Sequence, residues 1–230
     1  MKTFLTILFL TLLTVSNGQT DHSQRKSADS IIAERQNLLF NFLNISLQDK
    51  VADIGTGDGF NLIPIANRYP TLTFTAEDID SKYCNKELLA KRIKKSGDIT
   101  KIENINIQIG TEKTTNLPTN SFNKVLLFDV VHEMTFKPEM LADIKRILTK
   151  GGNMYIQEIL VHKKVKKDKV CNYPYLTGDA LKVLLQDNKI TINKEQMFFD
   201  TGHNKYIKLF ECSFMNYPDA LHRYWQKRAD

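Results

Sequence analysis

Short apolar runs alternate with amphipathic stretches over residues 50–159, and this alternation limits the folds open to the chain. Between the runs, apolar residues recur at helical spacing. Strands that alternate with helices of this length form a parallel sheet with helices on both faces. The predicted strands are 50–54, 72–76, 105–109, 124–128 and 153–159, and the predicted helices are 30–43, 61–68, 82–95 and 138–148.

The last third of the chain departs from this pattern. Residues 177–185 predict a helix with Thr177 as its cap, and two β-rich runs follow at 189–199 and 206–214. The turn-like sequence DTGHN separates these runs, so we expect a hairpin-like pair on the sheet edge. The complete prediction is an α/β fold with a Rossmann-like, doubly wound, mostly parallel seven-stranded sheet, helices on both faces and an antiparallel terminal strand.

The first 18 residues have the layout of a secretory signal peptide. Met1 and Lys2 precede an apolar run over residues 4–15, and small residues stand before a cleavage point ahead of Gln19. The run is shorter than the roughly 20 residues that a membrane span needs, although an uncleaved anchor or a buried helix are alternatives. We predict an exported, periplasmic protein with no stable membrane span after cleavage, or a cytoplasmic one if no signal is present.

Residues 19–230 fit a single domain, because 230 residues favour one core and no linker marks a second domain. The net charge of +6 is partly local, with five lysines in residues 162–169. Such a run suits a solvated loop, an anionic substrate or a membrane headgroup surface. Aromatic residues do not interleave with the lysines, so nucleic acid is not predicted. The three cysteines, Cys84, Cys171 and Cys212, are widely spaced and form no metal pattern, so no metal site is predicted.

The sequence VADIGTGDGF, residues 51–60, places Gly55, Gly57 and Gly59 directly after the first predicted strand. In an open parallel sheet, ligands bind at the carboxyl ends of the strands, where glycines let the backbone approach them. The spacing D-x-G-x-G-x-G differs from the G-x-G-x-x-G of dinucleotide sites. The carboxylate of Asp53 therefore favours a cationic ligand without phosphate, and the alternative is a plain turn that Asp53 caps.

A second acidic residue, Asp78, ends the second predicted strand in TAEDID. It comes 23 residues after Gly55, close to the interval of about 20 at which an acidic residue meets a ribose. A carboxylate accepts hydrogen bonds from both ribose hydroxyls. The pattern predicts a nucleoside-containing ligand, and the alternative is that Asp78 begins a turn.

Four segments in this order resemble class I S-adenosylmethionine-dependent methyltransferases. They are VADIGTGDGF, AEDID, IGTEKTTNLPTNSFNKVLLFDVVHEM and MLADIKRILTKGGNMYIQE. The resemblance covers the core motifs in residues 45–160 and is weaker over 161–230, where the substrate side is expected. More narrowly, the chain is similar to bacterial methyltransferase-like proteins that carry signal peptides.

The resemblance implies a site for S-adenosylmethionine. Asp53 and the glycine loop would face its methionine part, Asp78 the ribose and Ile79 the adenine. Glu112 is a less certain match than Thr111 for contact with the adenine amino group, because the family commonly has its acid one place earlier. The residues implied to bind the cofactor are Asp53, Gly55, Thr56, Gly57, Gly59, Asp78, Ile79, Thr111, Glu112 and Asp129.

The candidate base is His132 in FDVVHEM, three residues after Asp129. Its ordinary pKa near 6.5 suits proton removal near neutral pH, and the alternative is a packing or surface histidine. Glu133 and Glu158 are weaker candidates for the same role. HEMTF lacks the second histidine of a zinc protease motif, and no NPPY-like sequence of DNA methyltransferases follows the fourth strand.

We therefore predict a methyltransferase that moves a methyl group to a small-molecule or lipid acceptor by in-line displacement. The alternatives are a non-catalytic binding protein with the same fold, or another enzyme with a nucleoside cofactor. The acceptor and the oligomeric state are left open.

Overall fold

The computed structural model describes residues 28–97, 99–163 and 172–215. The chain divides into two units, Met1–Glu34 and Arg35–Asp230, and the contacts described below belong to the second unit. The predicted signal peptide and Cys171 lie outside the described residues, so the predictions on them stay predictions. No helix in the described part of the chain is long and apolar enough to cross a membrane.

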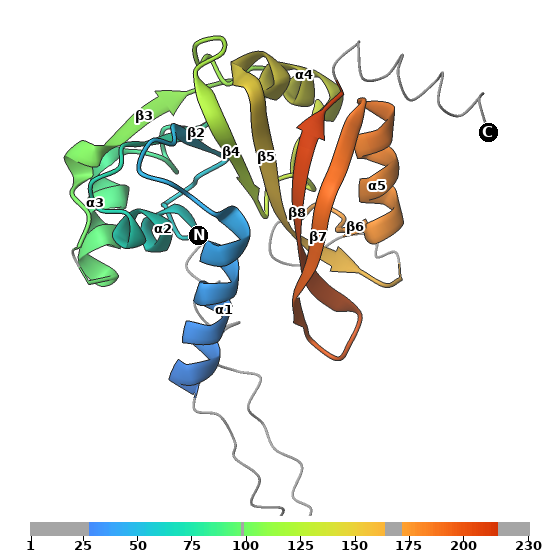
Figure 1. The fold of residues 1–230 in the computed structure, drawn as a ribbon, viewed down its shortest axis with the longest axis horizontal. Coiled ribbons are helices and arrows are strands. Elements are labelled where there is room, and N and C mark those ends of the chain that lie inside the picture. The colour runs from blue at the N-terminus through green and yellow to red at the C-terminus, as the bar shows by residue number, and fades with distance from the viewer. Residues whose placement is uncertain (1–27, 98, 164–171, 216–230) are drawn as a thin grey trace, which may run out of the picture. The chain divides into compact units, whose positions relative to one another are not determined.

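One sheet organises the second unit, with the strand order β3-β2-β1-β4-β5-β8-β7 (Figure 1). The strands β1 to β5 run parallel to one another, and β8 runs antiparallel to both β5 and β7. This confirms the predicted mostly parallel α/β sheet with an antiparallel terminal strand. The strand bounds are β1 Val51–Ile54, β2 Phe74–Asp78, β3 Ile105–Ile109, β4 Phe122–Phe128, β5 Leu148–Val161, β6 Leu176–Thr177, β7 Ile190–Asp200 and β8 Lys205–Phe214.

The predicted hairpin-like pair forms at the edge of the sheet, with β8 against β5 and β7 outermost. Two details of the sheet differ from the prediction. The strand β5 begins at Leu148, five residues earlier than predicted, because Gly151 and Gly152 lie within the strand where its register against β4 shifts. The two-residue strand β6, which pairs with the end of β5, makes the sheet eight-stranded and is too short to give a sequence pattern.

The helices follow the predicted ranges to within two residues, except that α3 begins at Lys86, four residues later than predicted. Pro64 falls in the first turn of α2, where a missing N–H costs nothing. The hydroxyl of Thr177 accepts a hydrogen bond from the Ala180 N–H at 3.1 Å, which confirms the predicted cap of α5. The helix bounds are α1 Ala28–Leu43, α2 Leu62–Arg68, α3 Lys86–Lys95, α4 Lys137–Ile147 and α5 Gly178–Asp187, with a 3-10 turn at Ile102–Asn104.

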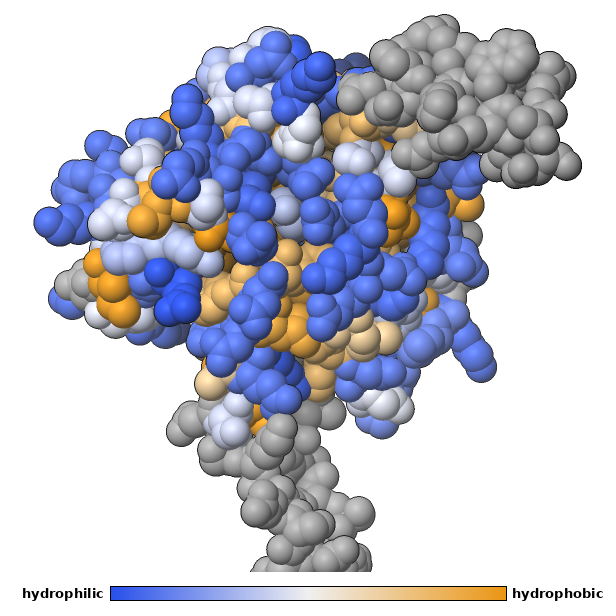
Figure 2. Space-filling model, viewed as in Figure 1, coloured by the Kyte–Doolittle hydropathy of each residue, from blue (hydrophilic) through white to orange (hydrophobic). Residues whose placement is uncertain are grey.

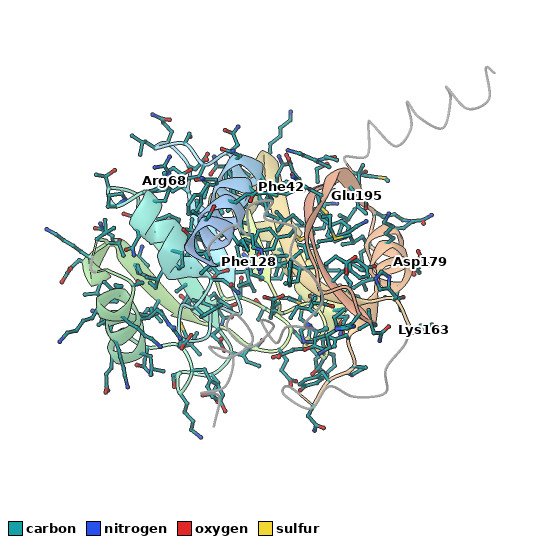
Figure 3. All side chains as sticks on the ribbon, turned by 90° about the horizontal axis from the view of Figure 1, so that it is seen from below. Phe42, Arg68, Phe128, Lys163, Asp179 and Glu195 are labelled. Atoms are coloured by element: carbon teal, nitrogen blue, oxygen red, sulfur yellow. The ribbon has the colours of Figure 1, made fainter. Side chains whose placement is uncertain are left out.

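Two apolar layers, one on each face of the sheet, hold the helices against it. On β4, Val125 and Leu127 pack in the layer with α4 and α5, whereas Leu126 and Phe128 pack in the layer with α2 and α3. Phe42, at the end of α1, belongs to the second layer, and Figure 3 shows it with Phe128 among the side chains near the sheet. Buried side chains on both faces explain why β4 reads as a continuous apolar run.

Charged side chains cover aromatic rings on the outside of this layer. The guanidinium of Arg35 lies 3.7 Å from the ring centre of Phe199, and the ammonium of Lys194 lies 4.7 Å from that of Phe42. The face seen in Figure 2 is accordingly mostly hydrophilic, with apolar patches between the charged groups.

Candidate active site

The predicted site residues meet at one edge of the sheet. Ile54, the last residue of β1, is in register with Glu77 of β2 and with Leu127 of β4. The residues that follow these three positions therefore leave the sheet side by side. The glycine loop, Asp78 and Asp129 are brought together in this way, at the carboxyl ends of neighbouring parallel strands.

Hydrogen bonds fix the glycine loop against β2. The Gly57 N–H donates to Oδ2 of Asp78 at 2.9 Å, and the Thr56 N–H donates to the Glu77 carbonyl at 2.9 Å. The Thr56 hydroxyl donates to the Asp53 carbonyl at 2.8 Å. Hydrogen bonds within the protein thus hold the loop conformation.

The three glycines serve different purposes, although each has a positive φ. A Cβ on Gly55 would lie 2.4 Å from Cγ2 of Val130, and one on Gly59 would lie 2.7 Å from Cδ2 of Leu89. A Cβ on Gly57 would meet no atom within 4 Å. Gly55 and Gly59 are therefore required by packing, whereas Gly57 presents bare backbone to open space.

An ion pair that was not predicted from the sequence connects the glycine loop to α3. The guanidinium of Arg92, on α3, pairs with the carboxylate of Asp58 inside the glycine sequence. The same guanidinium lies 5.2 Å from the ring centre of Phe60. The pairing joins positions 34 residues apart, so no local pattern could have revealed it.

The residues predicted near an adenine lie beside Asp78 with differing exposure. Ile79 is 52% exposed, which leaves its apolar side chain uncovered. The Gly110 N–H donates to the Asp78 carbonyl at 3.0 Å and places the turn after β3 next to Asp78. Within that turn, Thr111 and Glu112 are exposed, and the Thr111 hydroxyl accepts the Lys113 N–H at 3.2 Å. The structure therefore brings Ile79, Thr111 and Glu112 to the same edge of the sheet as Asp78.

Two carboxyl groups of this region are buried and hold their protons unusually tightly. Burial raises the pKa of Asp53 to about 7, against the hydrogen-bonding effect of Thr56 and with a contribution from the charge of Asp78. Burial and then the charge of Asp78 raise the pKa of Glu77 to about 8. Oε1 of Glu77 has no hydrogen-bond partner among the described residues, and a Cβ on Gly110 would come within 2.0 Å of it.

Glu77 should make the stability of the protein depend on pH. The folded state holds the Glu77 proton up to about pH 8, whereas an exposed glutamate releases it near its ordinary pKa of 4.5. The free energy of unfolding therefore falls as pH rises through this window, by about 1.4 kcal/mol per pH unit for one such group. We expect Glu77→Gln to remove this contribution and to be more stable than the wild type above pH 8 by at least about 2 kcal/mol.

Urea unfolding at a series of pH values would measure this difference. Glu112→Gln is the matched control, because Glu112 is an exposed carboxylate in the adjacent turn. Parallel pH curves for the wild type and Glu77→Gln would contradict the assignment of the pH dependence to Glu77.

Asp129 begins the second half of the site, directly after β4. It has a φ of 56°, and its N–H donates to the Gln157 carbonyl at 2.8 Å. Oδ2 accepts a hydrogen bond from the Gln157 amide at 3.1 Å, and Oδ1 is buried without a hydrogen-bond partner in the described structure. Burial, followed by the charge of Glu158, raises the pKa of Asp129 to about 7.

His132 is almost completely buried, at 5% exposure, and pairs with Glu158 of β5. Its Nδ1 lies 2.5 Å from Oε1 of Glu158, and its Nε2 lies 3.8 Å from Oε1 of Glu133. The ring centres of His132 and Tyr175 are 4.9 Å apart. Burial alone would lower the pKa of His132, but the hydrogen bond and charge of Glu158 outweigh it, so the pKa is raised.

Sequence reasoning named His132 and Asp129 but missed Gln157, which hydrogen-bonds to Asp129. Gln157 lies 28 residues further along the chain, and the pairing of β4 with β5 brings it to the end of β4. In the described residues, no group of three His, Cys, Asp or Glu side chains is placed to hold a metal ion. Cys84 and Cys212 are buried and free.

Solved structures with little sequence identity share this fold. The [4+2]-cyclase SpnF is 12% identical with a TM-score of 0.65, and 86% of each chain is covered. A SAM-dependent methyltransferase from Aquifex aeolicus is 17% identical with a TM-score of 0.59, covering 78% of this chain and 89% of that one. The glycopeptide N-methyltransferase MtfA, complexed with sinefungin, is 13% identical with a TM-score of 0.62, covering 79% and 85%. No curated protein matches the sequence.

The strand order, the glycine turn after β1 and the acidic residue at the end of β2 define the Rossmann-like class of methyltransferase folds. The profile of the methyltransferase-domain family matches residues 45–206, which is more than half of the chain. The chain therefore belongs to the methyltransferase-domain family. The finer resemblance to signal-peptide-bearing relatives stays a prediction.

Proposed function

We propose that the protein binds S-adenosylmethionine at the carboxyl ends of β1 and β2 and transfers its methyl group to a small-molecule or lipid acceptor. The observation that carries this proposal is the open backbone at Gly57, held by Asp78. A Cβ at Gly57 meets nothing within 4 Å, while its N–H is anchored to Asp78 at 2.9 Å. A ligand can approach the backbone there and reach the carboxylate at the same time.

The chemistry of the neighbouring side chains fits this cofactor. Asp53 and Asp129 are carboxyl groups with pKa values raised to about 7, so a nearby positive charge would favour their ionised forms. Asp78 would hold the ribose hydroxyls, and the uncovered side chain of Ile79 would pack on the adenine. Asp53, Asp129 and Asp78 thus suit a ligand that carries a sulfonium, an ammonium and a ribose.

When bound, the cofactor supplies a methyl group that is already activated on a positively charged sulfur. What remains for the protein is to hold the acceptor in line and to keep water away. Positioning of this kind can contribute about 7–11 kcal/mol to lowering a barrier. The side of the site formed by His132 and Tyr175, beyond Asp129, lies next to the glycine loop through the pairing of β1 with β4, and we assign it to the acceptor.

A second candidate is a protein that binds a nucleoside-like ligand without methyl transfer. The fold alone does not define the reaction, because the structural neighbour SpnF is described as a [4+2]-cyclase. The burial of His132 at 5% exposure also suits a packing role. The two candidates agree on ligand binding and differ in whether the methyl group leaves.

Calorimetric titration of the full chain with S-adenosylmethionine and S-adenosylhomocysteine tests the proposal. We expect both to bind at micromolar levels, followed by formation of S-adenosylhomocysteine when hydroxyl- and amine-bearing acceptors are supplied. Binding of both without product from any acceptor would favour the second candidate. A folded chain that binds neither would refute cofactor binding and reduce the glycine loop to a turn.

A further inference from the structure

We propose that Glu158 positions His132 to remove a proton from the methyl acceptor. The acceptor is then a hydroxyl or amine that must lose a proton when it is methylated. This inference rests on the proposed function, because it concerns the acceptor side of the same site. In this scheme His132 is the catalytic residue and Glu158 is the positioning residue.

The burial of Glu158 is the first observation. Glu158 lies in β5, is 0% exposed and is in register with Lys208 of β8. A carboxylate is costly to bury unless it is paired, and His132 is the partner that Oε1 meets at 2.5 Å. Oε2 has no hydrogen-bond partner within the described ranges. Packing alone would not select a buried carboxylate with half of its hydrogen-bonding capacity unused.

The identity of the contacting nitrogen is the second observation. A carboxylate accepts hydrogen bonds, so the Nδ1 beside Glu158 carries the proton of the neutral imidazole. The lone pair is then on Nε2, on the side of Glu133, whose side chain is 32% exposed. The pairing therefore selects the tautomer in which Nε2, the nitrogen away from Glu158, is the proton acceptor.

The carboxyl groups around the pair, those of Glu158, Glu133 and Asp129, favour a protonated imidazole ring. Glu133 lies 3.8 Å from Nε2, and the half-buried Asp129 adds a further negative charge. The ammonium of Lys137 donates to the carbonyls of His132 and Met134.

The remaining neighbours come from other elements. Tyr175 covers the His132 ring, and the ammonium of Lys205, on β8, lies 4.3 Å from the ring centre of Tyr175. Lys205 thus contacts the ring of Tyr175, whereas Glu158 and Glu133 lie beside the nitrogens of the imidazole.

The proposed step is a balanced proton transfer. The bond between the acceptor atom and its hydrogen breaks, and the proton forms a bond with Nε2. The electron pair stays on the acceptor atom, where it can form the bond to the methyl carbon. The resulting imidazolium is neutralised by Glu158 and later returns its proton to water. General-base assistance of this kind is worth about 10²–10⁴-fold in rate.

An NMR titration of the full chain saturated with S-adenosylhomocysteine tests the pairing directly. Long-range ¹⁵N–¹H correlations report the tautomer and pKa of each imidazole, and His132→Gln identifies the signals. We expect the wild type to carry its neutral proton on Nδ1. In Glu158→Gln, the pKa of His132 should fall by about one pH unit or more, because the charge is lost and burial remains. Equal pKa values and tautomers in both proteins would overturn the proposal.

Acylation of His132 by diethyl pyrocarbonate, followed by peptide mass spectrometry, tests whether Nε2 can be reached. We expect modification of the folded complex, with a pH midpoint that moves down in Glu158→Gln. A histidine with a purely structural role would stay unmodified until unfolding, and this result would also overturn the proposal.

Two controls separate this inference from cofactor binding. Glu133→Gln removes the neighbouring, more exposed carboxylate and should shift the pKa of His132 less than Glu158→Gln does. If Glu158→Gln does not fold, Glu158→Asp replaces it as the test. The aspartate keeps the charge but places it one methylene further from His132. We then expect smaller decreases in the pKa of His132 and in the pH midpoint of its acylation. Calorimetry with S-adenosylhomocysteine on each variant shows whether the cofactor site is intact. If the wild type does not bind S-adenosylhomocysteine, the result counts against the proposed function. It does not count against the pairing of Glu158 with His132.

Discussion

Replacing Asp78 by alanine is expected to weaken the binding of S-adenosylhomocysteine by at least about 100-fold, or about 2.7 kcal/mol. The carboxylate has a role inside the protein as well as the proposed one toward the ribose. Oδ2 accepts the Gly57 N–H at 2.9 Å, and Oδ1 accepts the Asp80 N–H at 3.1 Å. Hydrogen bonds to a charged group contribute about 1.5–3 kcal/mol each. The variant loses both the bond from the Gly57 N–H and the proposed bonds to the ribose, so its loss of binding free energy should exceed that of losing either one.

Calorimetry at constant pH would measure the loss. Asp80→Ala is the matched control, since Asp80 is a nearby acid whose Oδ1 accepts the Lys82 N–H within its own turn. We expect that variant to bind within about threefold of the wild type. Similar affinities for Asp78→Ala and the wild type would refute the assignment of Asp78 to the ribose.

Gly55→Ala is expected to lose mainly folding stability, whereas Gly57→Ala is expected to lose mainly cofactor binding. Both positions have a positive φ, so a side chain costs about 1–2 kcal/mol in each. At Gly55 the new Cβ would also lie 2.4 Å from Val130, and we expect a further loss of about 1–3 kcal/mol of folding stability. At Gly57 the Cβ enters open space, so the fold should survive while the cofactor is excluded.

Denaturant unfolding and calorimetry on the same variants would separate the two effects. Gly151→Ala is the control, because Gly151 has a φ of +80° and an equally open surrounding but lies outside the site. Gly57→Ala and Gly151→Ala should lose similar amounts of stability, and only Gly57→Ala should lose at least about tenfold in affinity. Unchanged binding by Gly57→Ala would show that no ligand approaches this backbone.

Most of the fold could be predicted from the sequence, because its signals are local. The run at β4 is continuous since both faces are covered, and the cap at Thr177 lies three residues from its donor. The start of β5 was misplaced because Gly151 and Gly152 look like a break, whereas pairing with β4 carries the strand through them. Strand order within the terminal hairpin depends on which partner buries β8, and no local pattern encodes that choice.

The candidate site likewise contains residues that the local sequence predicts and residues that it does not. Residues that end strands, such as Asp78 and Asp129, were predictable because parallel strands bring their carboxyl ends together. The partner of Asp129 was not, since Gln157 lies 28 residues further along the chain, and the buried Glu77 reads as an ordinary strand position. Burial and pairing are properties of the packed sheet. The roles assigned to Thr111, Glu112 and the other cofactor residues stay predictions.

The position of β8 also sets the order in which the protein can be completed during synthesis. The segment from β1 to β2, with the glycine loop and Asp78, needs no residue beyond β4 for its strand pairing. Glu158, by contrast, lies in a strand with an open edge until β8 is made near the end of the chain. Long-range pairing of this kind is slow, and an unpaired edge invites aggregation. A nascent chain can therefore pair the strands around the glycine loop and Asp78 first, whereas the strand that carries Glu158, the partner of His132, is completed only when β8 pairs with it.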